Sequence, residues 1–159
     1  MPLDEYKKKR DLKKTGEPAG KLSTRDQDRF VVQKHAASHL HFDFRLELAG
    51  VLKSWAIPKE PSTDPSVKRL AVQVEDHPVD YINFTGKIPE GEYGAGTVSI
   101  WDKGTYQNLK TESLDKQLSA GQLEIELSGK KLKGNFALVR FQGQKKNWML
   151  IKMKDENES

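Results

Sequence analysis

Uninterrupted alternation of polar and apolar side chains from residue 39 to residue 48 constrains this 159-residue chain more than any other segment. Because successive side chains of a β-strand point to opposite faces, the segment is predicted to be a strand with one face in a hydrophobic core. That face holds only leucine and phenylalanine. The other face is polar and holds His39, His41, Asp43, Arg45 and Glu47.

The polar face of this strand suits a metal ion. Imidazole and carboxylate ligands favour Mn²⁺, Fe²⁺, Co²⁺ or Zn²⁺, and a catalytic ion takes about three protein ligands with one position left open. Spacing leaves two triads open. In one, His39, His41 and Asp43 stand about 7 Å apart along the strand, which requires a bulge. In the other, a turn over residues 36–38 brings His35 back over His41 and Asp43. The alternative is that the face binds no metal ion and is only the exposed polar side of an amphipathic strand.

Further short alternating segments, separated by turn residues, fill most of the chain. We expect strands at residues 29–34, 51–58, 68–75, 97–101, 105–109, 122–127, 131–141 and 148–153. Tight turns are predicted at Ala49-Gly50 and at Asp102-Lys103-Gly104. The glycine-rich residues 81–96 lead into a strand rather than a helix, which favours turns over a phosphate-binding loop.

This pattern is typical of a mostly β fold, a compact antiparallel β-barrel of about eight strands with one or two short helices. One helix is predicted at residues 112–120, capped by Thr111 or Ser113 and ended by Gly121. A short helical turn is expected near residues 5–9. We divide the chain into a basic N-terminal arm at 1–27, a β-barrel domain at 28–154 and a frayed tail at 155–159.

The net charge of +4 arises in the first 34 residues, which hold ten Lys/Arg against six Asp/Glu, whereas the remainder holds seventeen of each. A basic arm beside a metal site indicates a polyanionic partner, with nucleic acid the first candidate. The chain has no cysteine, which excludes disulfides and thiolate metal sites. No apolar stretch is long enough to span a bilayer, so we expect a cytoplasmic protein without a membrane partner, and a monomer.

A metal site that faces a phosphate also needs cations and a proton source. Arg45 shares the face of the candidate ligands. Lys59 and Arg69 lie near strand ends, from which side chains reach a barrel mouth. His77, the only histidine outside the cluster, fits either an acid or a phosphate contact. Tyr81 supplies a hydroxyl four residues later.

Two other functions fit parts of the same pattern. His41, Asp43 and His77 also match the 2-His-1-carboxylate triad of non-haem Fe(II) oxygenases. Those enzymes generally hold a basic residue shortly after the distal histidine, whereas the next arginine here is Arg140, which disfavours this alternative. A non-catalytic barrel that only binds nucleic-acid ends is the other alternative.

Two longer stretches, Val32–Lys59 and Val74–Trp101, closely resemble the 3′-phosphoesterase module of the bacterial DNA ligase D family and its free-standing relatives. They contain H-A-A-S-H-L-H-F-D-F-R-L-E-L, V-E-D-H-P-V-D-Y and I-P-E-G-E-Y-G-A-G-T. The resemblance implies a β-barrel that binds Mn²⁺, with Co²⁺ or another divalent transition metal as substitute. It also implies that the protein removes a terminal ribonucleoside and then the 3′-phosphate from a DNA primer-template, leaving a 3′-OH.

Carried over by position, the resemblance selects His35, His41 and Asp43 as metal ligands and leaves His39 outside the site. It places residues needed for activity or for holding the phosphate at Arg45, Lys59, Arg69, His77 and Tyr81. In the arm, the K-R-D…E pattern used for ribonucleoside removal matches Arg10, Asp11 and Glu17.

The chain departs from the family at Thr85, where relatives commonly have an acid, and we assign that position no role. No K-x-D-G signature of a ligase nucleotidyl-transfer domain occurs in the sequence. We therefore expect the protein to act with a separate DNA ligase and polymerase in DNA end joining.

Overall fold

The structure, a computed structural model, describes residues 3–18 and 27–154. The predicted tail at 155–159 and residues 19–26 of the predicted arm lie outside the described residues. The helices are α1 (Asp4–Lys8), α2 (Leu12–Thr15), α3 (Leu114–Ala120) and the 3-10 helix η1 (Val79–Asn83). The strands are β1 (Arg29–Ala36), β2 (Leu40–Leu48), β3 (Val51–Ile57), β4 (Lys68–His77), β5 (Gly86–Ile88), β6 (Gly96–Asn108), β7 (Gln122–Ser128), β8 (Lys133–Arg140) and β9 (Asn147–Lys152).

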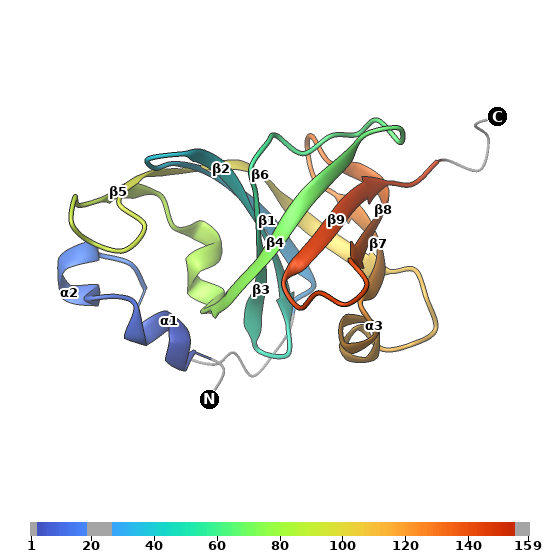
Figure 1. Ribbon diagram of the computed structural model, residues 1–159, viewed down its shortest axis with the longest axis horizontal. Helices are drawn as coiled ribbons and strands as arrows, with labels where there is room; N and C mark the ends of the chain where they lie inside the picture. Colours follow the sequence, from blue (N-terminus) through green and yellow to red (C-terminus); the bar gives the residue numbers. More distant parts are fainter. Residues whose placement is uncertain (1–2, 19–26, 155–159) are drawn as a thin grey trace.

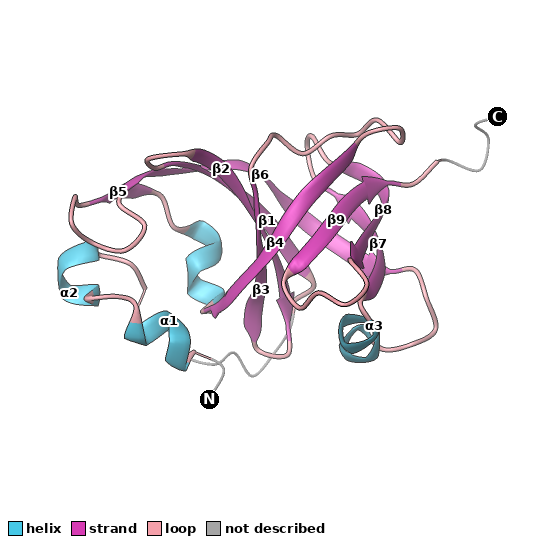
Figure 2. Ribbon diagram, viewed as in Figure 1, coloured by secondary structure: helices cyan, strands magenta, loops and turns pink. Residues whose placement is uncertain are grey.

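Eight of these strands form a closed antiparallel barrel. Their order is β1-β2-β3-β4-β9-β8-β7-β6, and pairing of β1 with β6 closes the ring. The short β5 extends the sheet as a further strand on β6. Figure 1 shows α1, α2 and β5 gathered at one end of the molecule and α3 at the other. The predicted mostly β barrel is confirmed, and little of the chain is helical (Figure 2).

Apolar side chains, which alternate with polar ones along the strands, fill the barrel interior. Phe44, Leu46 and Trp55 join apolar residues of β7, β8 and β9 in one buried cluster. Residues of opposite parity therefore point out of the barrel. On β1 and β3, this outer face carries a second cluster, in which Val31 and Leu52 pack against Tyr6 of α1 and Tyr81 of η1. The arm and η1 thus cover the outside of the barrel wall.

The predictions of the helices and of the first hairpin are largely confirmed. The β2–β3 hairpin turns at Ala49-Gly50 as expected, with Leu48 opposite Val51. Ser113 caps α3 by accepting a hydrogen bond from the amide of Lys116, and Gly121 ends that helix with a φ of +84°. The helical turn predicted near residues 5–9 is α1.

The prediction of a hairpin turn at Asp102-Lys103-Gly104 is wrong. β6 continues through these residues as one strand, which pairs with β1 and, towards its end, also with β7. A register shift opposite Val32 and Gln33 leaves Trp101 as an extra residue, so the strand bends at a bulge rather than reversing. The expected connection at residues 81–96 also contains elements that were not predicted, the end of η1 and β5.

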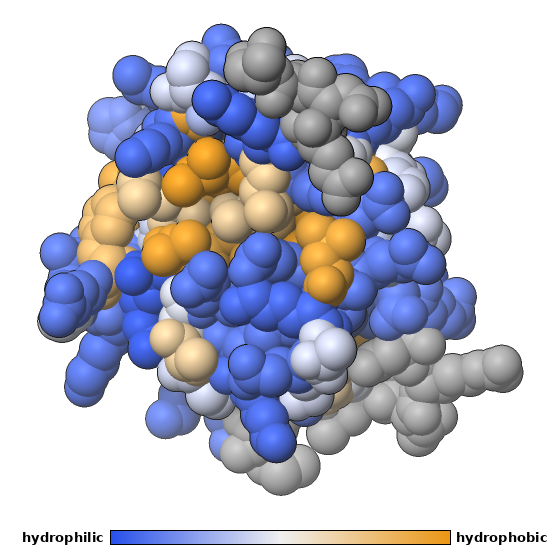
Figure 3. Space-filling view, turned by 90° about the vertical axis from the view of Figure 1, so that its right-hand side faces the viewer, coloured by the Kyte–Doolittle hydropathy of each residue, from blue (hydrophilic) through white to orange (hydrophobic). Residues whose placement is uncertain are grey.

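The outer face of β4, β9 and β8 is partly apolar. Register places Leu70 beside Met149 and Met149 beside Val139. Figure 3 shows apolar side chains gathered among hydrophilic ones on that side of the molecule. Among the described residues, no helix is long and apolar enough to cross a membrane.

A buried carboxylate holds the β7–β8 turn to β6. Asp102 is 4% exposed and accepts hydrogen bonds from the amides of Lys130, Lys131 and Leu132. Its distances to these amides are 2.9, 3.1 and 2.8 Å. Hydrogen bonds to a charged acceptor are stronger than neutral ones, so this side chain is a main anchor of the turn.

We expect Asp102→Asn to lower the free energy of unfolding by about 2–3 kcal/mol, because the amide is neutral and directs an NH₂ group at backbone donors. Urea denaturation monitored by tryptophan fluorescence measures the change. Asp115→Asn, at the exposed start of α3, is the matched control and should change stability by less than about 1 kcal/mol. Equal stability of Asp102→Asn and the wild type would show that the carboxylate does not anchor the turn.

A second buried carboxylate, Glu47, fastens the start of β1 to the end of β2. It accepts hydrogen bonds from the Arg29 guanidinium at 3.1 and 2.9 Å and from the amide of Gln27 at 2.9 Å. Burial by itself raises the pKa of Glu47, but these donors outweigh it and lower the pKa below the ordinary value of 4.5.

A lowered folded-state pKa means that Glu47 stabilises the fold above the ordinary carboxyl pKa, and that this stability is lost as the pH falls through the folded-state pKa. We therefore expect the unfolding free energy of Glu47→Gln to depend less on pH than that of the wild type between about pH 5 and pH 3. Urea denaturation at several pH values tests this. Glu112→Gln, on an exposed side chain, should retain the wild-type profile, and parallel profiles for all three proteins would contradict the prediction.

Candidate metal centre and cleft

Two histidines and an aspartate meet on the outer face of the barrel wall. The antiparallel register of β1 and β2 places His35 directly opposite His41, and Asp43 follows on the same face. One ligand atom from each of the three residues lies within 4.8 Å of the others. The Nδ1 atom of His35 lies 3.6 Å from Asp43 Oδ2, and the Nε2 atom of His41 lies 3.3 Å from it. Of the two triads that spacing left open, the structure assembles the one with His35.

Backbone carbonyls fix the protonation pattern of both imidazoles. His35 Nε2 lies 2.7 Å from the carbonyl of Gly94, and His41 Nδ1 lies 3.2 Å from that of His39. Because a carbonyl only accepts, each of these nitrogens carries the proton. The remaining lone pairs, on His35 Nδ1 and His41 Nε2, therefore face the carboxylate of Asp43. With both rings neutral, these three acceptors converge on one point and form a site for a cation, and a carbonyl on the far nitrogen is the usual support of a metal-bound histidine.

The electrostatics of Asp43 also suit a ligand. Burial by itself raises the pKa of this carboxyl, but Arg45 and the two imidazoles outweigh it and hold the pKa far below its ordinary value. Arg45 Nη2 lies 3.5 Å from the same Oδ2 atom. Asp43 also raises the pKa of His41 despite the burial of the ring, because the carboxylate accepts a hydrogen bond from Nε2 when the imidazole is protonated. Asp43 is thus ionised at any physiological pH, as a metal ligand must be.

Arg45 is held rigidly beside this group. Its Nε donates to the side-chain oxygen of Gln33 at 2.7 Å, and Gln33 donates in turn to the carbonyls of Tyr81 and Phe84. The guanidinium carbon lies 4.9 Å from the centre of the Tyr81 ring. The buried Nη1 group has no hydrogen-bond partner among the described residues. An oriented cation with a spare donor suits an oxyanion such as a phosphate.

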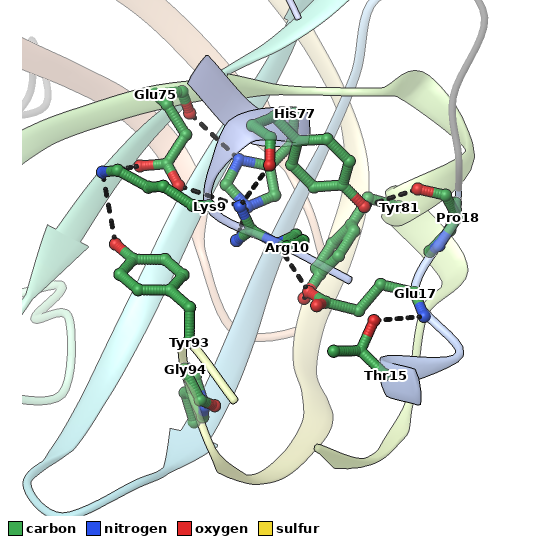
Figure 4. A network of polar contacts seen from close by, with 12 residues as sticks. Lys9, Arg10, Thr15, Glu17, Pro18, Glu75, His77, Tyr81, Tyr93 and Gly94 are labelled. Atoms are coloured by element: carbon green, nitrogen blue, oxygen red, sulfur yellow. Dashed lines mark hydrogen bonds and ion pairs between the residues drawn. The ribbon is translucent and has the colours of Figure 1, made fainter. Parts of the chain in front are cut away.

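The arm completes the opposite wall through a network of polar contacts that Figure 4 shows from close by. Arg10 follows α1 and donates to Glu17 at 3.1 Å and to Glu75 at 3.0 Å. Its Nη2 also lies 3.2 Å from His77 Nε2. Tyr81 donates its hydroxyl proton to Glu17 at 2.6 Å. Glu17 of the arm and Glu75 and His77 of β4 thus meet at one arginine, and Tyr81 joins them through Glu17.

His77 is neutral in this arrangement. Its Nδ1 donates to the carbonyl of Glu75 at 3.0 Å, so Nε2 accepts the hydrogen bond from Arg10. Burial, with Arg45 and Arg10 nearby, holds the pKa of His77 well below its ordinary value of 6.5. The ring packs edge-on against Tyr6 and Tyr81, with centroids 5.0 and 4.7 Å away. These contacts fix the imidazole in place beside the cleft.

These groups line a cleft of about 310 Å³. Among the predicted site residues, the cleft brings together Arg10, Glu17, His35, His41, Asp43, Arg45, His77 and Tyr81. The cleft lies on the outer face of β1 to β4. Lys59 and Arg69, which the sequence analysis placed near a barrel mouth, are not among its lining residues.

The other predicted site residues lie outside this lining. Asp11 is exposed at the start of α2, where it pairs with Lys14 at 4.0 Å. Lys59 is exposed after β3, and Arg69 Nε donates to the carbonyl of Glu60 at 2.8 Å. His39 is exposed and lies immediately before β2. His77 is not grouped with His41 and Asp43, so the described residues do not form the oxygenase-type triad that the sequence also allowed.

Three residues that hold side chains of the cleft in place were not predicted. Gln33 orients Arg45, Glu75 holds Arg10, and the carbonyl of Gly94 supports His35. Gln33 lies two residues before His35 and therefore points to the same side of the predicted strand, which was a signal that the sequence offered. Nothing in the sequence relates Gly94 to a residue 59 positions earlier.

We expect Gly94→Ala to weaken Mn²⁺ binding by about tenfold, because the supporting carbonyl of a metal-bound histidine sets its orientation and basicity. Gly94 has a φ of +77°, so an alanine there is strained and shifts the carbonyl that lies 2.7 Å from His35 Nε2, while its Cβ would make a van der Waals contact with His35 Cε1 at 3.5 Å. Isothermal titration with Mn²⁺ measures the affinity.

Gly91→Ala is the matched control for this substitution. Gly91 has a similar φ of +88°, but an added Cβ would meet nothing within 4 Å. This variant should suffer the same backbone strain and bind Mn²⁺ as the wild type does. Equal weakening in both variants would mean that loop strain, and not the His35 contact, determines the affinity.

Known proteins match this chain over most of its length. A family model described as the DNA ligase D 3′-phosphoesterase domain matches residues 33–140. The "Multifunctional non-homologous end joining protein LigD" of Pseudomonas aeruginosa is 52% identical over 97% of this chain and 19% of the relative. The protein of the same name from Mycolicibacterium smegmatis is 44% identical over 99% of this chain and 21% of the relative.

A third relative is the "Multifunctional non-homologous end joining DNA repair protein LigD" of Mycobacterium tuberculosis. It is 43% identical over 98% of this chain and 20% of the relative. The chain therefore spans about one fifth of the length of these curated relatives.

Proposed function

The chain belongs to the DNA ligase D 3′-phosphoesterase family, as its sequence motifs indicated, and from this premise we propose that it is a metal-dependent enzyme of DNA repair. In the proposed reactions it removes a 3′-terminal ribonucleoside from a DNA primer-template and then the 3′-phosphate. The product is a 3′-OH end. The observation that carries the proposal is the convergence of three ligand atoms beside the spare donor of Arg45.

His35, His41 and Asp43 are the residues that would hold the ion, and we propose Mn²⁺, with Co²⁺ or another divalent transition metal as substitute. Two imidazoles and one carboxylate suit these ions and leave coordination positions free. A bound ion of this kind supplies a positive charge that polarises a phosphate oxygen.

Arg45 binds the phosphate in this proposal. Its Nη1 donor lacks a partner, and its Nε is held by Gln33, so the guanidinium keeps its orientation when an anion arrives. Fixed cations stabilise the negative charge that grows on the phosphoryl oxygens while water attacks phosphorus. Tyr81 stacks on the guanidinium and positions it. Lys59 and Arg69 would contact the anion from outside the cleft.

His77 contributes to the reaction only when the substrate phosphate is bound. A neutral imidazole whose Nε2 accepts from Arg10 has no proton to donate there. A phosphate dianion next to the ring favours the charged form and raises its pKa. We therefore assign to the resulting imidazolium either a hydrogen bond to the phosphate or protonation of the leaving oxygen.

Arg10, Asp11 and Glu17 of the arm would hold the terminal nucleotide during ribonucleoside removal. A ribose differs from a deoxyribose by its 2′-OH, which both donates and accepts hydrogen bonds. The buried Oε1 atom of Glu17 has no hydrogen-bond partner among the described residues and suits such a hydroxyl. We further propose that a separate ligase and polymerase use the healed 3′-OH end.

The experiment that tests this function is a 3′-end assay. A labelled primer-template with one terminal ribonucleotide is incubated with the protein and Mn²⁺, and the products are resolved on a sequencing gel. We expect conversion to a 3′-phosphate end and then to a 3′-OH end. EDTA should abolish both steps, and His41→Ala should slow them by at least about a hundredfold, because a metal ligand is lost.

His39→Ala is the matched control, since His39 lies on the neighbouring exposed segment and outside the ligand group. It should retain wild-type activity. An unchanged primer with Mn²⁺ and with other divalent ions would refute the proposed enzyme. Binding of the primer-template without turnover would instead support the non-catalytic end-binding barrel.

A further inference from the structure

The cleft continues into two neighbouring grooves, one on each side. The first, here called the α1–β4 groove, shares Val74 and Glu75 with the cleft. The second, the glycine-loop groove, shares Ala37, Ile88 and Gly94 with it. A nucleic-acid strand that ends in the cleft must leave it along a surface of this kind. The two grooves differ in charge, and that difference indicates which one a polyanion follows.

The α1–β4 groove has an apolar floor and a basic rim. Val72 and Val74 lie on its floor, and its charged lining residues are Glu5, Lys9, Glu75, Lys145 and Lys146. Both carboxylates already have partners. Glu5 pairs with Lys9 at 3.3 Å, and Glu75 pairs with Arg10 at 3.0 Å and with Lys9 at 3.3 Å. Among the described residues, Lys145 and Lys146 make no ion pair, so their charges are available to a ligand.

The glycine-loop groove has the opposite balance. Its charged lining residues are Lys87, Glu90 and Glu92, which give one positive charge against two negative charges. Such a negatively charged surface repels phosphates, whereas the lysines of the α1–β4 groove attract them.

The backbone beneath Lys145 and Lys146 is firmly held. The carbonyl of Lys146 accepts a hydrogen bond from the amide of Gln73 on β4 at 2.7 Å. The amide of Phe141 donates to the carbonyl of Asn147 at 2.9 Å across the β8–β9 turn. Two exposed ammonium groups therefore stand at a fixed place beside β4, the strand that carries Val74 and His77 into the cleft.

We propose that the α1–β4 groove is the path of the DNA strand whose 3′ end lies in the cleft, with Lys145 and Lys146 contacting its phosphates. The inference rests on the proposed function for the position of the 3′ end. Val72 and Val74 face the sugars along the groove floor, and the lysines neutralise phosphates one or more nucleotides 5′ of the reacting end. The glycine-loop groove stays free of this strand.

The test is DNA binding in EDTA, measured by fluorescence anisotropy with a labelled primer-template that carries a 3′-phosphate. We expect the double variant Lys145→Ala/Lys146→Ala to bind about tenfold more weakly at moderate salt. The slope of log affinity against log salt should fall by about 1.5, because each lost phosphate contact contributes about 0.7–0.9. A nucleoside 3′-monophosphate, used as competitor, has no phosphate 5′ of the reacting end and should bind both proteins equally.

Lys130→Ala/Lys133→Ala is the matched control, because it removes two exposed lysines at the start of β8, about 25 Å along that strand from the β8–β9 turn. It should bind DNA as the wild type does. Equal weakening in both double variants, or none in either, would overturn the proposed path. Weaker binding by Lys87→Ala alone would also overturn it, because the strand would then follow the glycine-loop groove.

The binding measurement tests the strand path, and the 3′-end assay tests the proposed function, so a negative result in one does not decide the other. Since EDTA prevents metal-dependent turnover, a protein without activity in the 3′-end assay counts against the proposed function only. Selective loss of binding in Lys145→Ala/Lys146→Ala would still support the strand path.

Discussion

The pairing of β1 with β2 sets the position of every group in the candidate metal centre. Because the side chains of a strand alternate with a period of two, a slip of one residue would turn His41 and Asp43 into the barrel and Phe42 and Phe44 out of it. The apolar face prevents this slip, since burying phenylalanine in the core is strongly favourable. The hydrophobic pattern thus fixes the geometry of polar groups that it does not include.

Burying charge is the second requirement of this site. Glu17, Asp43, Arg45 and Glu75 are all at most 7% exposed, and each would be costly to bury alone. Each meets an opposite charge in the cleft, which offsets part of this cost. Buried ion pairs of this kind often stabilise a fold less than apolar residues of similar size would. Their cost is consistent with a role in binding an anion rather than in folding.

Much of this could be predicted from local sequence, and the failures have a common cause. Alternation predicted the barrel and its strands. A turn after His35 was enough to name His35, His41 and Asp43 as one of two possible triads, and the structure brings the ligand atoms of that triad together. The bulge at Trp101 was missed because an Asp-Lys-Gly run has the composition of a turn, while its pairing with β1 and β7 is a tertiary property. The role of Gly94 and the place of the cleft on the outer wall also depend on contacts between distant segments. Lys59 and Arg69 do not line the cleft, and their predicted contact with the anion stays a prediction.

The cleft and the hydrophobic core use opposite faces of the same strands. Asp43 and Phe44 are neighbours in the chain, yet one faces the candidate metal centre and the other the barrel interior. Mutations that repack the interior therefore change different residues from mutations that alter substrate recognition. Evolution can tune the thermal stability of such a barrel and its chemistry separately, strand by strand, although each strand serves both.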